Sequence, residues 1–315
     1  MDVSRAELAA VARRCFDSAP ALASQGHLDL GGSLLWYGVV GHRDDRPPIV
    51  CVHGGPGGVS HEVLWPLAAL ALTGRRVVFF DQLGCGRSTR EVDVDALGIH
   101  SYVAQVRAVI DGLGLGRCHV LGHSFGGMVT QEIALSDPGR LRSVVLADTS
   151  SDLDRYLAEG EAIRQRLPPD IRELLETGDQ RLPGHADAYR TYLEQFSCRL
   201  RPVPLALRRA RDGGNDSVTE AMWGPGGQTF AVTGRLGGWT CLERLPQLSV
   251  PALVITGEHD IASPALVALS ARAIPSAALH VVAGGSHTPF FDDPGDFLEV
   301  VAAFLSRHDG DGGTD

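Results

Sequence analysis

The chain has 315 residues, 44% of them hydrophobic, and a formal net charge of −10. This hydrophobic content is enough for a sizeable core and excludes wholesale disorder. Every one of the 28 basic residues is arginine, and acidic residues outnumber them. Nucleic acid is therefore not expected as a partner, because its binding depends on neutralising phosphates. The length favours one large domain with a substantial insertion.

The cysteines and the apolar runs predict the cellular compartment of the protein. The six cysteines are dispersed without a C-x-x-C pair, so neither a disulfide framework nor a zinc site is expected. Charged residues interrupt the first 20 residues, unlike a secretory signal. No apolar run approaches the length of about 18 residues that a membrane span needs. We expect a soluble cytoplasmic protein with no membrane partner, metal or organic cofactor, and its oligomeric state stays open.

The first half of the chain alternates strand-like and helix-like segments. Its patterns predict, in chain order, a helix over 6–16, two strands within 27–40, a strand over 49–52, a helix over 60–72, a strand over 76–80, a helix over 100–113, a strand over 118–121, a helix over 128–135 and a strand over 141–147. The central strands are short and fully apolar, as in strands buried on both faces. This alternation predicts a parallel sheet with helices on both faces.

The pattern changes near residue 151. Residues 151–239 contain no strand-like run, and helical spacing of Arg, Glu and Leu predicts an α-helical cap inserted into the sheet domain. The predicted core therefore comprises 1–150 and 240–308. Strands are expected again over 252–256 and 279–282, followed by a last helix over 294–307. The Gly- and Asp-rich tail 309–315 is expected to be disordered.

A candidate nucleophile lies between a predicted strand and a predicted helix. Residues 122–126 read G-H-S-F-G, and this G-x-S-x-G motif in a strand–turn–helix context is typical of a strained elbow that exposes a serine. The start of the following helix favours developing negative charge near the Ser124 hydroxyl. The sequence therefore predicts Ser124 as a catalytic nucleophile.

A serine hydroxyl needs a general base, and that base needs an orienting acid. Enzymes with such an elbow place serine, acid and histidine in that chain order. Asp260 follows the predicted strand 252–256, and His287 follows the strand 279–282. Both should reach the same sheet edge as Ser124, where ligands bind in open parallel sheets. We predict Asp260 as the orienting acid and His287 as the base.

Four neighbouring residues are alternatives or accessories. Asp148 also ends a strand and is the rival acid. Glu258 is expected to shape its turn, and His259 to face the pocket. His123, beside the nucleophile, is interpreted as a packing or hydrogen-bonding residue of the elbow.

Acyl transfer also requires donors aimed at the oxyanion. One should be the backbone N–H of Phe125, the residue after the nucleophile. The other is expected from the glycine-rich turn 53–58, and we choose Gly55. The segment 81–88 after the next strand is interpreted as a structural brace for this loop.

Arginines are dense in one part of the cap, at Arg199, Arg201, Arg208, Arg209 and Arg211. The simpler interpretation is a solvated helix face. The alternative is a basic lip over a pocket for an anionic substrate.

Three motifs carry a family resemblance: HGGPG at 53–57, DQLGCGRS at 81–88 and GHSFGG at 122–127. Together they resemble the proline iminopeptidases and tricorn-interacting aminopeptidases. The likeness continues through 223–230, 233–234, Trp239 and GEHD at 257–260. It implies an α/β-hydrolase fold, a mostly parallel sheet flanked by helices with an α-helical cap, and cleavage of an N-terminal residue from a small-molecule or short-peptide substrate.

The resemblance breaks where the family recognises the free ammonium. One family carboxylate follows the catalytic aspartate, and here that position is Ile261. Another precedes the phenylalanine that matches Phe230, where this chain has Gln228 and Thr229. A cation in a partly desolvated pocket needs a compensating charge, so the substrate is expected to differ. The residues expected to contact the substrate are Gly54, Trp223, Gln228, Thr229, Phe230 and Ile261.

Three functions follow as hypotheses. The first is a serine amide or peptide hydrolase, iminopeptidase-like but changed in substrate. The second is an ester, thioester or lactone hydrolase of secondary metabolism. The third is a catalytically silent binding protein on a hydrolase scaffold, against which the complete Ser, Asp and His set argues.

Overall fold

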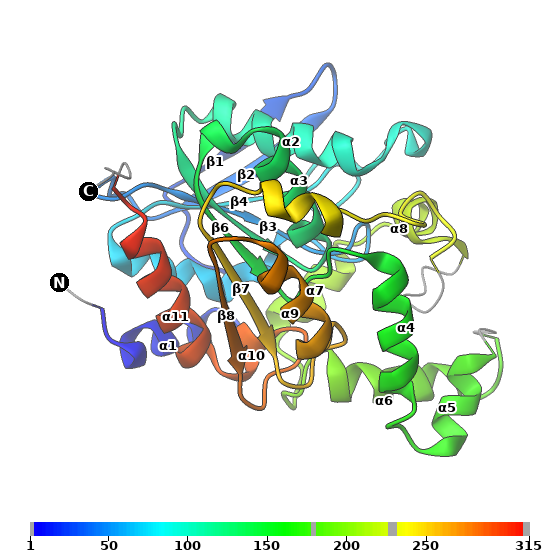
Figure 1. Ribbon diagram of the computed structural model, residues 1–315. Coiled ribbons are helices and arrows are strands. Elements are labelled where there is room, and N and C mark those ends of the chain that lie inside the picture. The colour runs from blue at the N-terminus through cyan, green and yellow to red at the C-terminus, as the bar shows by residue number, and fades with distance from the viewer. Residues whose placement is uncertain (1–2, 178–180, 226–231, 311–315) are drawn as a thin grey trace.

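The computed structural model describes residues 3–177, 181–225 and 232–310 (Figure 1). Within them, eight strands form one sheet in the order β1-β2-β4-β3-β5-β6-β7-β8. These strands are β1 (Ser24–Asp29), β2 (Leu34–Val40), β3 (Ile49–Val52), β4 (Val77–Phe80), β5 (Cys118–His123), β6 (Leu141–Ala147), β7 (Ala252–Gly257) and β8 (Ala277–Val282).

The sheet is mostly parallel, which confirms the predicted fold class. β2 pairs antiparallel with β1 and with β4, whereas β4, β3, β5, β6, β7 and β8 run parallel to one another. All residues of β3, β4, β5 and β7 are buried, because helices cover both faces of a parallel sheet. The carboxyl ends of the parallel strands therefore meet at one edge.

Helices form a layer on each face of the sheet (Figure 1). Side chains of α2, α3 and α9 share one apolar cluster with the sheet, and those of α1, η1 and α11 share the other. The core helices and 3-10 segments are α1 (Arg5–Arg14), η1 (His61–Thr73), η2 (Val94–Ala96), α2 (Ile99–Gly112), α3 (Phe125–Ser136), η3 (Pro138–Arg140), η5 (Leu242–Gln247), α9 (Pro264–Ala273), α10 (Pro289–Asp292) and α11 (Pro294–Arg307).

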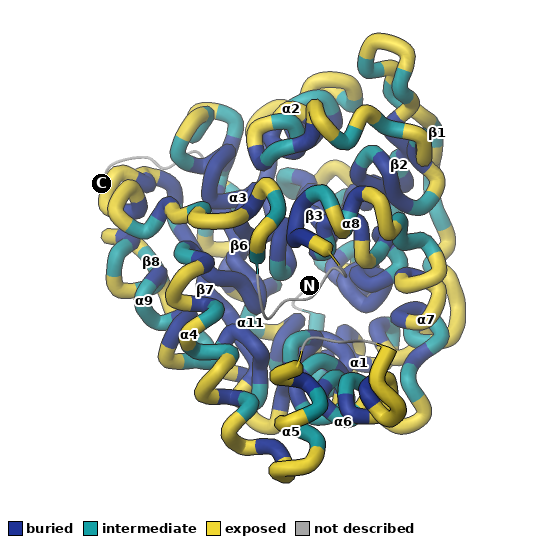
Figure 2. The backbone as a smooth tube through the Cα atoms, turned by 90° about the vertical axis from the view of Figure 1, so that its right-hand side faces the viewer, coloured by how far each residue is buried: buried dark blue, intermediate teal, exposed yellow. Residues whose placement is uncertain are grey.

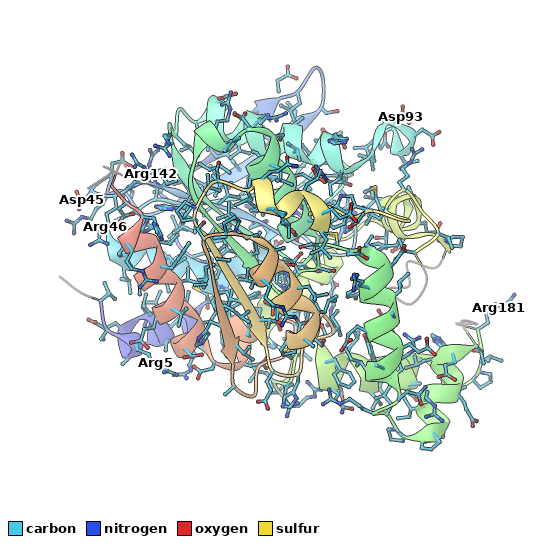
Figure 3. All side chains as sticks on the ribbon, viewed as in Figure 1. Arg5, Asp45, Arg46, Asp93, Arg142 and Arg181 are labelled. Atoms are coloured by element: carbon cyan, nitrogen blue, oxygen red, sulfur yellow. The ribbon has the colours of Figure 1, made fainter. Side chains whose placement is uncertain are left out.

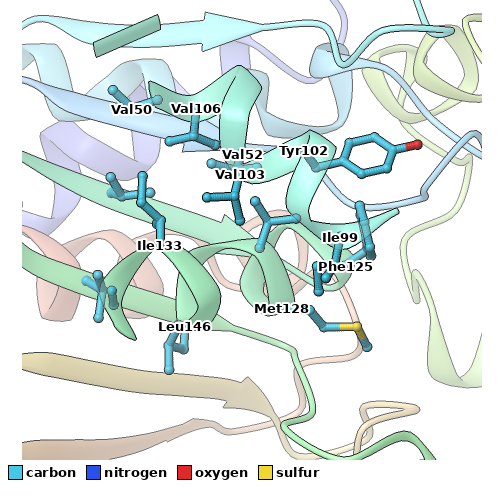
Figure 4. Close-up of a cluster of buried hydrophobic side chains, with 14 of the residues drawn as sticks. Val50, Val52, Ile99, Tyr102, Val103, Val106, Phe125, Met128, Ile133 and Leu146 are labelled. Atoms are coloured by element: carbon cyan, nitrogen blue, oxygen red, sulfur yellow. The ribbon is translucent and has the colours of Figure 1, made fainter. Parts of the chain in front are cut away.

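Alternate residues of each strand serve the two apolar clusters. Val50 and Val52 pack with Tyr102 and Val106 of α2 (Figure 4), while Ile49 and Cys51 belong to the opposite cluster. This alternation follows from the two-residue period of a strand. Figure 2 shows the buried strands inside the exposed outer faces of the helices.

The predicted cap region contains five described α-helices, which lie between β6 and β7 in the sequence. They are α4 (Leu153–Arg164), α5 (Pro169–Glu176), α6 (His185–Phe196), α7 (Leu205–Asp212) and α8 (Asp216–Trp223). Helices α4, α5 and α6 enclose a small apolar cluster of their own, which also receives Ile261 from the core. Side chains of α7 instead join the cluster around η1, so this helix is packed directly on the core.

Two elements differ from the sequence expectation. The helix predicted over 60–72 is the 3-10 helix η1, and Pro66 lies inside it. The proline ring clashes with the carbonyl four residues earlier, which disfavours α-helical geometry at this point. Helix α9 was not predicted, although Ser263 caps it through the N–H of Leu266 and Pro264 occupies its first position.

The predicted tail also begins later than expected. Asp309 accepts hydrogen bonds from Arg75 at 3.0 and 3.2 Å and contacts His119 Nε2 at 3.1 Å. The Arg75 side chain is fully buried, so Asp309 supplies its counter-charge and disorder from residue 309 was wrong for this residue. Residues 311–315 lie outside the described part.

The outer surface is charged and polar. Asp45, Asp93 and Arg181 are exposed and project outward (Figure 3). Within the described residues, no helix has the length and apolar character that crossing a membrane requires.

Candidate active site

Ser124 lies on a sharp turn between β5 and α3. Its backbone has φ 55° and ψ −122°, a conformation that L residues rarely adopt and that is common at functional sites. A Cβ at Gly122 would collide with Gly126 O and Thr130 Oγ1, and one at Gly126 would collide with Val52 O. Both outer glycines of the motif are thus required for strand and helix to approach.

The structure brings Ser124, His287 and Asp260 into one hydrogen-bonded chain. His287 Nε2 lies 3.0 Å from Ser124 Oγ, and His287 Nδ1 lies 2.6 Å from Asp260 Oδ1. The three residues follow β5, β8 and β7 at the carboxyl edge of the sheet. Asp260 can therefore hold the imidazole with Nε2 facing the serine hydroxyl.

Asp260 is itself fixed by neighbouring donors. It is 1% exposed, accepts a hydrogen bond from Thr256 Oγ1 at 2.8 Å and another from the N–H of Ala262 at 2.9 Å. A buried carboxylate that accepts from several donors is held in one orientation. Sequence reasoning did not identify Thr256, which belongs to β7.

Asp148, the rival acid, occupies a different position. It follows β6 with φ 53°, and its Oδ1 accepts a hydrogen bond from the N–H of Gly257 at 3.1 Å. Burial, and then the charge of Asp260, raises the pKa of Asp148 well above its ordinary value. A carboxyl whose ionisation is disfavoured by burial is poorly suited to stabilise an imidazolium.

The other accessory residues also have distinct places. His123 Nε2–H donates to the carbonyl of His287 at 2.7 Å, and burial lowers the pKa of His123 to about 3. His123 is thus a neutral hydrogen-bonding residue of the elbow, as interpreted. The exposed Glu258 accepts from the N–H of Gly284 at 2.8 Å, and His259 is absent from the described lining of the cavity.

Two backbone N–H groups are candidate donors for an oxyanion site. Among the hydrogen bonds of the described residues, none uses the N–H of Phe125 or of Gly55. Phe125 is the first residue of α3, where helix geometry leaves N–H groups without a partner. Gly55 has φ 122°, which favours glycine at this position.

Hydrogen bonds from the core and from the cap fix the loop that carries Gly55. In the core, His53 Nε2 accepts from the N–H of Gln82 at 3.0 Å, while His53 Nδ1–H donates to Gly54 O at 2.8 Å. Burial lowers the pKa of His53, which suits this neutral form. From the cap, Trp223 Nε1–H donates to Gly55 O at 2.9 Å.

A cavity of about 320 Å³ opens at Ser124. Gly54, Trp223 and Ile261 line it, as expected from the sequence, whereas Gln228, Thr229 and Phe230 lie outside the described residues. Sequence reasoning did not single out several other lining residues: Val63, Met128, Tyr156, Tyr189, Leu207 and Thr219. The lining is mainly apolar, as in most small-molecule sites.

One cluster in the described residues has ligand types suited to a metal: His61, Glu62 and Asp81. Asp81 Oδ1 already accepts from the backbone N–H of His61 at 2.8 Å and from its ring at 2.9 Å. Asp81 Oδ2 accepts from the N–H of Arg87 at 2.8 Å. These bonds brace the 81–88 segment, and the cluster is apart from the described cavity lining.

Comparison with known proteins agrees with this fold. The family model for the alpha/beta hydrolase fold matches residues 47–294, and the chain belongs to this family. Within it, the chain is a member of the proline iminopeptidase group of hydrolases. Proline iminopeptidase of Lactobacillus delbrueckii subsp. lactis is 30% identical over 296 residues, which cover 91% of this chain and 99% of that relative.

Two solved structures are also similar over most of the chain. Proline iminopeptidase of Mycobacterium smegmatis has 33% identity and a TM-score of 0.83, covering 91% of this chain and 99% of the other. VinJ has 30% identity and a TM-score of 0.86, covering 91% and 100%. The resemblance predicted from the motifs is therefore confirmed at the level of family and fold.

Proposed function

We propose that the protein is a serine hydrolase that cleaves an amide or peptide bond through an acyl-enzyme and does not require a free N-terminal amine. The observation that carries the proposal is the hydrogen-bonded chain Ser124–His287–Asp260 at the wall of a mainly apolar cavity. A serine beside a base, itself oriented by a carboxylate, is the arrangement that nucleophilic catalysis needs.

In the proposed first step, Ser124 Oγ attacks the acyl carbon while His287 Nε2 takes the hydroxyl proton. The carbonyl electron pair moves to oxygen, where the N–H groups of Phe125 and Gly55 stabilise the charge. Collapse of this intermediate expels the leaving group, which receives the proton from His287. Water, deprotonated by His287, then attacks the acyl-enzyme and releases the acid and free Ser124.

The cavity supports a substrate without a cationic terminus. Among the described lining residues, Asp148 is the one carboxylic acid, and burial raises its pKa well above the ordinary range. Ile261, 8% exposed, presents a hydrocarbon at the position where the resemblance leads one to expect a glutamate. An ammonium group would be desolvated here without an ionised partner.

An ester, thioester or lactone hydrolase is the second candidate. The same feature favours it, since an uncharged acyl group suits the lining and the proposed chemistry is common to amides and esters. Such a substrate would suit a pathway of secondary metabolism. The two candidates differ in the leaving group that His287 must protonate.

Two measurements test the proposal. A fluorophosphonate probe should label the wild type and not Ser124→Ala, and absence of labelling would leave a catalytically silent scaffold. Rates should then be compared on proline p-nitroanilide, N-acetylproline p-nitroanilide and a p-nitrophenyl acyl ester. We expect the blocked amide or the ester to exceed the free amine in kcat/KM, and a clear preference for the free amine would overturn the proposed substrate change.

A further inference from the structure

One arginine of the dense cluster in the cap reaches the active-site cavity. Arg211, in the last turn of α7, lines the same cavity as Ser124 and His287. The other four arginines of that cluster, Arg199, Arg201, Arg208 and Arg209, are absent from the described lining. Arg211 is therefore the one arginine of this cluster among the described residues that line the cavity.

Two other arginines of the cluster have partners of their own. Arg201 pairs with Glu194 at 3.2 Å, and Arg209 lies over the ring of Trp65, 5.9 Å from its centroid. For Arg211, no side-chain hydrogen bond or ion pair is found among the described residues. Arg211 is an exposed residue, and its positive charge acts on the partly buried Tyr189, another cavity residue, opposing the rise in pKa that burial causes there.

Few of the described lining residues can carry a charge. Arg211 is permanently positive, whereas burial lowers the pKa of His123 to about 3, and burial raises the pKa of Asp148, the one carboxylic acid of the described lining, well above its ordinary value. A guanidinium among the residues that line a mainly apolar cavity is suited to a carboxylate or another planar anion, which it can bind through two parallel N–H groups.

We propose that Arg211 binds an anionic group of the substrate, so that the natural substrate is an acyl compound with a negatively charged end. This inference rests on the proposed function, because it assigns a substrate class to the same site. It replaces the cation recognition of an aminopeptidase with recognition of the opposite charge. The apolar lining then accommodates the segment between the charged end and the reacting carbonyl.

The test compares charged and neutral versions of one substrate. On the acyl side, the probes are the mono-p-nitrophenyl ester of adipic acid and its methyl-capped diester. On the leaving-group side, the probes are the butyrate esters of 4-hydroxybenzoate and of methyl 4-hydroxybenzoate. Within each pair, the ratio of kcat/KM for the anion to that for the neutral compound is measured in wild type, Arg211→Gln and Arg208→Gln.

Arg211→Gln should lower this ratio about 5- to 10-fold in one of the two pairs, as expected for a partly exposed ion pair. Arg208→Gln, an exposed change on the same helix, should leave the ratio unchanged. If the acyl pair is the one affected, Arg211→Glu should reverse the preference for the anionic acyl group. The variant should then favour the ester of 6-aminohexanoate, whose acyl end is positively charged. Because each comparison is a ratio, differences in intrinsic reactivity cancel between variants.

The outcomes separate the two proposals. Wild-type turnover that disappears in Ser124→Ala, with equal ratios in wild type and Arg211→Gln for both pairs, would overturn the role of Arg211 and leave the hydrolase intact. Turnover of no probe by the wild type, together with no fluorophosphonate labelling, would overturn both. Circular dichroism of each variant verifies that the fold is kept.

Discussion

Trp223 and Gly55 join the cap to the oxyanion loop: the indole Nε1–H of Trp223 donates to the carbonyl of Gly55 at 2.9 Å. Gly55, whose N–H is the proposed second oxyanion donor, is thus held by a side chain from α8.

Replacing Trp223 by phenylalanine removes this hydrogen bond and keeps an aromatic ring. We expect kcat to fall about fivefold, since one lost hydrogen bond is worth roughly 1 kcal/mol, with a smaller effect on KM. Trp239→Phe is the matched control, because Trp239 Nε1 donates to Glu132 Oε1 at 3.0 Å, and Trp239 is absent from the described cavity lining. Equal kcat values for the two variants would contradict the positioning role of Trp223.

The two candidate acids should respond very differently to amide replacement. Asp260→Asn removes the acceptor that orients His287, and we expect kcat to fall by about 10⁴. Asp148→Asn replaces a carboxyl with a raised pKa by a neutral group of similar shape, and we expect less than about a threefold change in kcat. Steady-state kinetics of both variants on one ester decide the assignment, and a larger loss in Asp148→Asn would reverse it.

Asp148 should also make stability depend on pH. Its pKa in the folded state is raised well above the ordinary value of 3.8. Its contribution to stability is therefore complete below that ordinary value and is lost as pH rises through the folded pKa. Asp148→Asn removes this titration, so its Tm relative to wild type should increase between pH 4 and pH 7. Parallel Tm curves would show that Asp148 ionises normally.

The opposite dependence is expected at Asp309. Burial opposes its ionisation, but hydrogen bonds from His119 and Arg75 outweigh burial and lower the pKa of Asp309. Its stabilisation is present above its unfolded pKa and is lost as pH falls through the lower folded value. The acid limb of the wild-type Tm profile should therefore flatten in Asp309→Asn.

At neutral pH, Asp309→Asn leaves the buried guanidinium of Arg75 without its counter-charge. We expect a loss of about 2 kcal/mol in the free energy of unfolding, less than for a fully buried pair because the Asp309 side chain is 17% exposed. Asp45→Asn is the control, since its pair with Arg43 is exposed. Urea denaturation measures both, and equal losses would show that Asp309 is an ordinary surface residue.

The sequence predicted the sheet, and the meeting of Ser124, Asp260 and His287 at one sheet edge, because both depend on where buried strands begin and end. Apolar runs identified the buried strands, and the order of Ser124, Asp260 and His287 along the chain follows from where parallel strands end. The 3-10 geometry of η1 was not predictable from apolar spacing, because helical types share nearly the same periodicity. The place of Asp309 depends on Arg75, which is 234 residues away, and no local pattern carries that information.

The cavity lining was the hardest part to predict. Arg211 and Tyr189 belong to amphipathic helices whose orientation depends on packing against the core rather than on their own sequence. Helical periodicity predicts which residues share a face, but not whether that face looks toward Ser124. The dense arginines were visible in the sequence, and only the fold distinguishes Arg211 from its neighbours.

Backbone hydrogen bonds join the cap to the loops that carry His287 and Gly57, and these bonds limit how much of the cap can be exchanged. At the end of α6, the carbonyl of Phe196 accepts from the N–H of His287 at 2.9 Å, and before α8 the N–H of Asn215 donates to Gly57 O at 2.6 Å. A graft of the whole insertion from a relative would replace these anchors together with the specificity residues. Exchange confined to 153–176 would keep both anchors, which makes α4 and α5 the exchangeable module of this enzyme.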